Sequence, residues 1–306
     1  MKKKYFIYLF TDRGFGSEIL TLGISIILSD SVNLKFKMCS IYSNITYRLG
    51  WGDYFEPFCE EITDPILRKT FEFWGHDFKS QYKKFVYKIN VYWFLGFDFV
   101  CMHDLWERIW SKDFNKGVYN SFNLKLNNTT SVESMSIVLN SIWRPKNFIL
   151  KEVEEFVSNH KLFPGTFISL HVRRGDKIHG SLKEADIVDI NLFINYITLN
   201  LNTFRKILLI TDDYSCYEEL KAKIPSSEII CSADKAERGY YNSAFNNMPS
   251  DYRFNKIKNL ITQIELCRLS DFFLGTYSTN LSRLIAVLRN DINCHDILNA
   301  DLKIVL

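Results

Sequence analysis

Apolar runs that alternate with amphipathic stretches divide this chain into predicted strands and helices. Residues 4–11 form a short apolar run typical of a buried strand, and after a turn with two glycines an apolar helix is predicted for 18–28. Helical spacing of apolar residues also marks 132–143 and 147–160. A strand, a glycine turn and a helix in this order indicate the opening of an α/β unit.

The second half of the chain alternates strands and helices more clearly. Strands are predicted for residues 167–172, 206–211 and 272–275, and helices for 189–201, 215–224, 256–269 and 280–288. A capping box formed by Ser215 and Glu218 is expected to begin one of these helices. This alternation predicts a doubly wound parallel sheet, whose ligands bind beyond the carboxyl ends of the strands.

Length and composition indicate a folded protein of two domains. The 306 residues are 47% hydrophobic, and Pro164 with Gly165 predicts a boundary between an N-terminal α/β domain, residues 1–163, and a C-terminal domain, residues 164–306. The net charge of +3 is too small to indicate a nucleic-acid partner.

The cysteines and the start of the chain indicate the cellular compartment of the protein. Seven cysteines without a CxxC pair predict reduced thiols in the cytosol and neither a zinc site nor a disulfide framework. The first apolar run spans six residues before Asp12, too few for a signal peptide or a membrane span. We therefore expect a cytoplasmic protein without a transmembrane segment.

The segment His171–Lys177, directly after the predicted strand 167–172, is the first candidate site. Arg173 and Arg174 follow the carboxyl end of a strand, and the planar guanidinium of arginine can donate two parallel hydrogen bonds to a diphosphate. Alternatively, both arginines pair with Asp176 and nearby carboxylates in a solvated turn. The residues alone leave both interpretations open.

Two further clusters follow predicted strands. Thr276–Asn280 precedes a helix, where hydroxyls and backbone N–H groups either bind an anion or cap the helix. Asp212 and Asp213 are suited to binding a metal ion, orienting sugar hydroxyls or capping the next helix.

Two features are weaker on their own. Gly14 and Gly16 let a backbone approach a phosphate closely, although a structural turn explains them equally well. Glu184 follows the basic cluster and is the acid we choose as general base, with a surface glutamate as the alternative. The other histidines show no metal-ligand spacing, so no metal site is predicted.

Together and in this order, these clusters resemble the α1,6-fucosyltransferase family, which includes core-fucosylating enzymes and rhizobial nodulation relatives. His171–Lys177 matches its HVRR-x-DK motif, Thr211–Asp213 its acidic strand end, and Thr276–Arg283 its T-[FY]-S-S-[NQ]-x-x-R motif. The glycine turn and residues 43–64 are also similar to the family. The resemblance covers most of the chain as a minimal catalytic core, and it is weakest between about 65 and 130.

This resemblance implies a GT-B-like fold of two Rossmann-type domains, the C-terminal one binding the nucleotide sugar. It implies an inverting, metal-independent glycosyltransferase that moves fucose from GDP-fucose to a glycan hydroxyl without a cofactor. Arg173 would hold the β-phosphate with help from Thr279 and Asn280, and Glu184, which precedes Ala185 as in the family motif, would accept the proton of the attacking hydroxyl.

The resemblance also implies roles for the remaining residues. His171 would contact the base or ribose, Asp212 would support the donor pocket, and Lys177 would serve the acceptor side. The other donor-side candidates are Gly14, Gly16, Arg174, Asp213 and Ser278, and Asp176 is a second acceptor-side candidate.

One position departs from the family pattern. Members of the family have two aspartates spaced eight residues apart, and the first of them hydrogen-bonds guanine. Asp271 matches the second aspartate, but Gln263 stands at the position of the first. Glutamine still hydrogen-bonds guanine but lacks the charge that favours two N–H donors. A different GDP-sugar or UDP-sugar donor is therefore an alternative, and a non-enzymatic glycan- or nucleotide-binding protein is a third.

Overall fold

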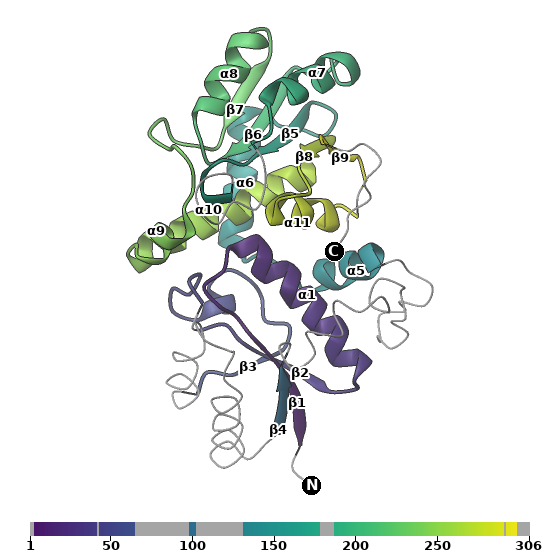
Figure 1. Ribbon diagram of the computed structural model, residues 1–306, viewed down its shortest axis with the longest axis vertical. Helices are drawn as coiled ribbons and strands as arrows, with labels where there is room; N and C mark the ends of the chain where they lie inside the picture. Colours follow the sequence, from purple (N-terminus) through teal and green to yellow (C-terminus); the bar gives the residue numbers. More distant parts are fainter. Residues whose placement is uncertain are drawn as a thin grey trace. The chain divides into compact units, whose positions relative to one another are not determined.

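The computed structural model describes residues 3–41, 43–64, 98–101, 131–177, 187–290 and 292–298 (Figure 1). Its backbone contacts divide the chain into two compact units, Met1–Arg144 and Pro145–Leu306. The predicted boundary at residue 164 follows helix α6 (Asn147–His160), whereas the structure places this helix in the second unit. The reason is packing, because α6 lies against α10 (Ser250–Leu269) of that unit.

The first unit contains a parallel sheet of four strands within its described residues. In spatial order they are β3 (Glu60–Glu61), β2 (Lys35–Cys39), β1 (Lys4–Leu9) and β4 (Asp98–Cys101). The described helices of this unit are α1 (Phe15–Ser31), the 3-10 helix η1 (Gly50–Asp53) and α5 (Ser131–Ile142). Phe6 and Ile7 of β1 are fully buried, as expected for a parallel strand between two neighbours. The glycine turn thus follows the carboxyl end of an inner strand.

The second unit contains a parallel sheet whose five described strands have the order of a Rossmann fold. In space they are β7 (Glu228–Cys231), β6 (Lys206–Thr211), β5 (Phe167–Val172), β8 (Phe272–Gly275) and β9 (Cys294–Asp296). The chain builds outward from β5 to β7 and then crosses back to β8. Strand order therefore reverses between β5 and β8, and open α/β sheets bind ligands at the carboxyl ends of strands at such a switch point. The predicted doubly wound sheet is confirmed.

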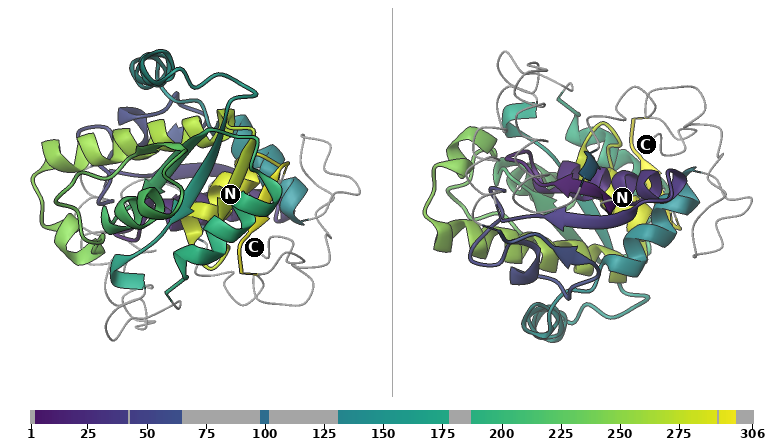
Figure 2. Two further views of the ribbon diagram at one scale, coloured as in Figure 1. Left: turned by 90° about the horizontal axis from the view of Figure 1, so that it is seen from above. Right: turned by 90° about the horizontal axis from the view of Figure 1, so that it is seen from below.

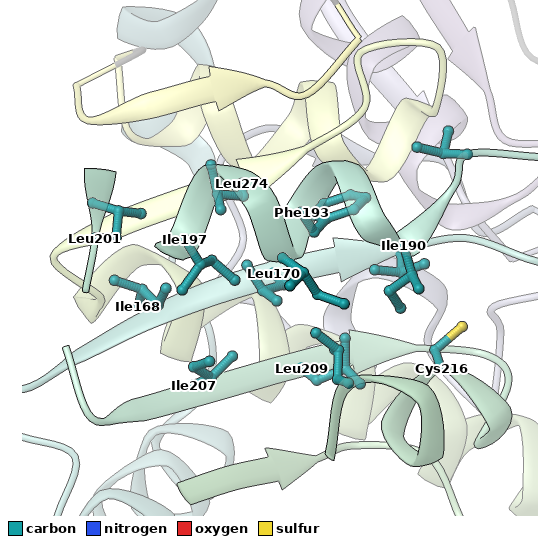
Figure 3. Close-up of a cluster of buried hydrophobic side chains, with 14 residues drawn as sticks. Ile168, Leu170, Ile190, Phe193, Ile197, Leu201, Ile207, Leu209, Cys216 and Leu274 are labelled. Carbon is teal, nitrogen blue, oxygen red and sulfur yellow. The ribbon is translucent and has the colours of Figure 1, made fainter. Parts of the chain in front are cut away.

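Helices cover both faces of this second sheet (Figure 2). Helices α7 (Ile190–Asn200) and α8 (Ser215–Lys223) lie over one face, and α10 and α11 (Asn280–Leu288) over the other. On the first face, Leu170 of β5 packs with Phe193 and Ile197 of α7 in the buried cluster of Figure 3.

The opposite face of β5 carries polar residues. Successive strand residues point to opposite faces, so Ser169 and His171 lie on the side of α10 and α11. Ser169 Oγ contacts Ser270 Oγ at 2.7 Å, and both residues are buried. The apolar side chains of β5 therefore pack into the core on one face, and its polar side chains form hydrogen bonds on the other face.

Several predicted elements have the bounds found in the structure. The strands 167–172, 206–211 and 272–275 and the helices 147–160 and 280–288 agree residue for residue. None of the described helices is long and apolar enough to pass through a bilayer.

The predicted capping box at α8 is wrong. The helix follows Tyr214 and already includes Ser215, whose side chain makes no cap. Instead, the carboxylate of Asp213 accepts a hydrogen bond from the Ser215 N–H at 2.9 Å. Ser215 is already the first residue of the helix, so the acid two residues before it binds a first-turn N–H in place of the expected serine.

Candidate active site

The basic loop after β5 is held by carboxylates. Arg173 Nη2 pairs with Asp176 Oδ1 at 2.7 Å, and its Nη1 pairs with Asp212 Oδ2 at 3.1 Å. The Arg173 side chain is only 19% exposed. The pairing with Asp176 that the sequence left open as an alternative is therefore present, but in a shielded site and not in a solvated turn.

Asp212 is the centre of this arrangement. One carboxylate oxygen accepts the Arg174 N–H at 2.7 Å, and the other accepts the Tyr240 N–H at 2.9 Å. Burial raises the pKa of Asp212, and the charge of Arg173 and the two N–H donors oppose that rise. Asp212 thus joins the basic loop to the segment that follows β7.

Asp213 acts at the start of α8, as described above, so the structure shows its helix-capping contact. Within the described ranges, no group of three or more His, Cys, Asp or Glu residues lies together as a possible metal site.

Tyr240 was not found by sequence reasoning, yet it contacts Arg173, Asp176 and Asp212. Arg173 Cζ lies over its ring, 4.9 Å from the centroid. The Tyr240 carbonyl accepts the Asp176 N–H at 3.1 Å, and its N–H binds Asp212. The segment Arg238–Asn242 therefore crosses the basic loop with both backbone and ring contacts.

Two glycines permit this crossing. Gly175 has φ of +80° and Gly239 has φ of +98°, a region that L-residues with side chains rarely adopt. A Cβ on Gly175 would lie 2.4 Å from the Tyr240 carbonyl oxygen, and one on Gly239 would lie 2.8 Å from the Gly175 Cα. The sequence shows only that both residues are glycines, and it is the fold that brings them together.

His171 is the last residue but one of β5, and its imidazole is buried. Its Nδ1 lies 2.7 Å from Ser282 Oγ and 3.5 Å from Thr279 Oγ1, and the residue is 4% exposed. Burial, and secondarily the charge of Arg173, lowers the pKa of His171 to about 3. The ring is therefore neutral at physiological pH and ties β5 to α11. Ser282 is a second residue that sequence reasoning missed as a contact, although it lies within the family motif.

We expect this buried imidazole to make the protein acid-sensitive. The unfolded chain protonates His171 near pH 6.5, whereas the folded protein resists protonation down to about pH 3. Stability therefore falls as the pH drops below 6.5, by up to about 1.4 kcal/mol per pH unit. Thermal unfolding between pH 7 and 4 should show a smaller loss of Tm for His171→Asn, whose amide does not titrate. The same pH dependence in both proteins would contradict this origin.

The loop between β8 and α11 brings its hydroxyls to the same sheet edge. Thr279 caps α11, accepting the Ser282 N–H at 3.4 Å and donating to the Thr276 carbonyl at 3.0 Å. Thr279 is buried, Asn280 is partly buried and Ser278 is exposed. The predicted helix cap is confirmed, and it lies beside the switch point where a ligand is expected.

Arg174 differs from Arg173 in its partners. Its guanidinium donates to the Arg173 carbonyl at 3.4 Å. Among the residues that the structure describes, no carboxylate lies within ion-pair distance of it. The two adjacent arginines therefore differ in charge pairing. Arg173 is paired with two carboxylates, whereas Arg174 has no carboxylate partner among the residues that the structure describes.

The structure describes only some of the other predicted site residues. Glu184 lies outside the described residues, and Lys177 is described only by its backbone in the 3-10 helix η5 (Gly175–Lys177). Gln263 lies on α10, partly buried. Asp176 binds Arg173 and also accepts the Asn242 N–H at 2.9 Å.

Gly14 and Gly16 belong to the first unit. Gly14 precedes α1, and a Cβ placed on it would meet no atom within 4 Å. The turn is supported by Glu18, a fully buried carboxylate that accepts from Tyr8 Oη at 2.7 Å and Arg13 Nε at 2.9 Å. Space is open beside Gly14, whereas Gly16 lies in the first turn of α1 and is buried, so the predicted turn ends before Gly16.

Solved structures of fucosyltransferases are similar in fold to this chain. Fucosyltransferase NodZ from Bradyrhizobium has a TM-score of 0.54 at 10% identity, covering 94% of each chain. A variant of Arabidopsis thaliana FUT1 in complex with GDP has a TM-score of 0.59 at 12% identity, covering 94% of this chain and 69% of FUT1. POFUT1 in complex with GDP has a TM-score of 0.53 at 9% identity, covering 95% and 97%.

These matches and the two parallel sheets define an α/β glycosyltransferase fold of the GT-B class, as predicted. A family model narrows the class. The model of the alpha-(1,6)-fucosyltransferase N- and catalytic domains matches residues 120–293, more than half of the chain. The chain therefore belongs to this fucosyltransferase family, which confirms the resemblance carried by its motifs.

Proposed function

We propose that this enzyme transfers fucose from GDP-fucose to a hydroxyl group of a glycan, with inversion at the anomeric carbon and without a divalent metal ion. Family membership supports a fucosyltransferase. The structural relatives include NodZ soaked with GDP-fucose, which supports this donor. A glycan acceptor and a cytoplasmic location stay predictions.

The observation that carries the proposal is the position of the arginines. Arg173 and Arg174 follow β5 directly, at the switch point between β5 and β8. The capped amino end of α11 follows β8, the other strand at this point. Guanidinium groups and helix N–H groups are both suited to binding phosphate, so a diphosphate here would meet donors from two neighbouring strands.

The proposed mechanism is a single displacement. The acceptor hydroxyl attacks the anomeric carbon as its proton passes to Glu184, and the bond to the diphosphate oxygen breaks. Arg173, Arg174 and the N–H groups near Thr279 stabilise the negative charge that develops on the leaving diphosphate. In this mechanism the arginines take the part that a divalent cation plays in metal-dependent enzymes.

The same fold could bind a donor with either guanine or uracil as its base, and Gln263 bears on which one it is. A carboxylate accepts the two N–H donors of guanine with the advantage of charge, whereas the Gln263 amide is neutral. Gln263 therefore supports the alternative of another GDP-sugar or a UDP-sugar. Gln263 is only partly buried on α10, so we expect a change of its side chain to be tolerated by the fold.

Calorimetric titration of GDP and UDP into the purified protein, with a chelator present, tests the proposal. We expect GDP to bind without metal and more tightly than UDP. Gln263→Asp should tighten GDP binding about tenfold, because a charge-assisted pair replaces a neutral hydrogen bond. UDP affinity should not change in this variant. Preference for UDP would overturn the fucose assignment, and binding only after metal addition would overturn metal independence.

A further inference from the structure

The geometry around Arg173 points to a residue that acts on the arginine and not on the donor. Two hydrogen-bonded carboxylates, Asp176 and Asp212, hold the guanidinium by its N–H edge. Hydrogen bonds of this kind lie in the guanidinium plane, so they leave its face to be restrained by another group. The Tyr240 ring is the group that the guanidinium carbon lies over, at 4.9 Å.

Tyr240 is itself held on three sides. Its hydroxyl donates to Asn242 Oδ1 at 3.0 Å, and its ring packs against Phe245, with centroids 5.6 Å apart. Its backbone is fixed by hydrogen bonds to Asp212 and from Asp176. A ring that is anchored in this way is a rigid surface for a cation, and cation–π attraction increases when water is excluded.

The charges explain why such a surface is useful. Asp176 and Asp212 both attract Arg173, and a movement toward either one would turn the guanidinium away from the other. The Tyr240 ring adds an attraction along a third direction without adding a formal charge. Any phosphate that binds Arg173 then meets a guanidinium whose orientation is already set, which lowers the entropic cost of binding.

We propose that Tyr240 is a positioning residue that orients Arg173 for the donor diphosphate. This inference rests on the proposed function, since it requires that Arg173 binds phosphate. Tyr240 acts through Arg173 and contributes no contact of its own to the nucleoside. The segment Arg238–Asn242, crossing Gly175, is the device that brings the ring to the basic loop.

Calorimetric titration with GDP and with guanosine separates this role from a purely structural one. Tyr240→Leu should weaken GDP binding about tenfold, in line with a shielded cation–π contact, and leave guanosine binding unchanged. Tyr240→Phe keeps the ring and should bind GDP nearly as wild type does. Tyr241→Leu, which removes an exposed neighbouring ring, is the matched control and should not alter either affinity.

A double-mutant cycle identifies the route of the effect. If Tyr240 acts only through Arg173, adding Tyr240→Leu to Arg173→Ala should cause no further loss of GDP affinity. Equal losses in both backgrounds would overturn the inference, as would wild-type GDP affinity in Tyr240→Leu. Failure of the wild-type protein to bind GDP is a different result, because it would reject the proposed function on which the inference rests.

A second measurement applies if Tyr240→Leu does not fold. Phenylalanine with one, two or three fluorine atoms on the ring keeps its shape while fluorine withdraws charge from the face. Incorporated at position 240, this series should weaken GDP binding in steps with the number of fluorine atoms, at unchanged Tm. Equal affinity across the series would contradict a cation–π role for Tyr240.

Discussion

Replacing Glu184 by glutamine should abolish sugar transfer and leave GDP binding unchanged. Glutamine has nearly the same shape but cannot accept the proton of the attacking hydroxyl. The loss of a general base typically lowers the rate by about 10²–10⁴-fold. Release of GDP from GDP-fucose in the presence of a glycan acceptor gives the rate, and calorimetry gives the affinity.

The same segment offers a matched control. Asp186 lies two residues after Glu184, and Asp186→Asn removes an equal charge from the segment. We expect this variant to keep its activity. Full activity of Glu184→Gln would refute its assignment as the base, and loss of activity in Asp186→Asn alone would transfer the role to Asp186.

Replacing Arg173 by alanine should weaken both donor binding and turnover. A bidentate contact of arginine with phosphate contributes about 1.5–3 kcal/mol, so GDP affinity should fall about 10–100-fold. The maximal rate should fall further, by about 10²-fold, because the charge on the leaving diphosphate grows in the transition state. Calorimetry and steady-state rates on one protein preparation separate the two effects.

Two variants control for other causes of this loss. Arg173→Lys keeps a positive charge near Asp176 and Asp212 but lacks the planar fork, so it should recover part of the GDP affinity. Arg174→Ala removes the neighbouring cation and should weaken binding while leaving the acid pairs of Arg173 in place. Unchanged GDP affinity in Arg173→Ala would count against its contact with phosphate.

The fold was predictable where strands are continuous apolar runs. β5 and β6 have the predicted bounds because inner strands of a parallel sheet are buried on both faces. The β2 strand was missed because its sequence, KFKMC, carries two lysines. The Lys37 side chain is only 8% exposed, pairs with Glu60 and lies 4.1 Å from the centroid of the Tyr5 ring. A buried and paired lysine looks like a surface residue in the sequence.

The site was predictable to the extent that its residues follow strands. Arg173 and Asp212 directly follow the paired last residues of two neighbouring parallel strands, so their contact follows from the topology. Tyr240 lies in an irregular segment after β7, where no periodicity assigns it a partner. Its ring reaches Arg173 only through the crossing of Gly175 and Gly239. Contacts of this kind depend on backbone conformation, which the order of residues does not reveal.

The glycine crossing also limits how this enzyme can be recombined with its relatives. Gly175 and Gly239 lie far apart in the chain, but a side chain at Gly239 would meet the backbone of Gly175, and a side chain at Gly175 would meet the backbone of Tyr240. A chimera that imports the segment around residue 239 from another enzyme must keep a glycine at 175, and the reverse holds for a grafted basic loop. The two segments therefore form one module, and they should be exchanged together or left in place together.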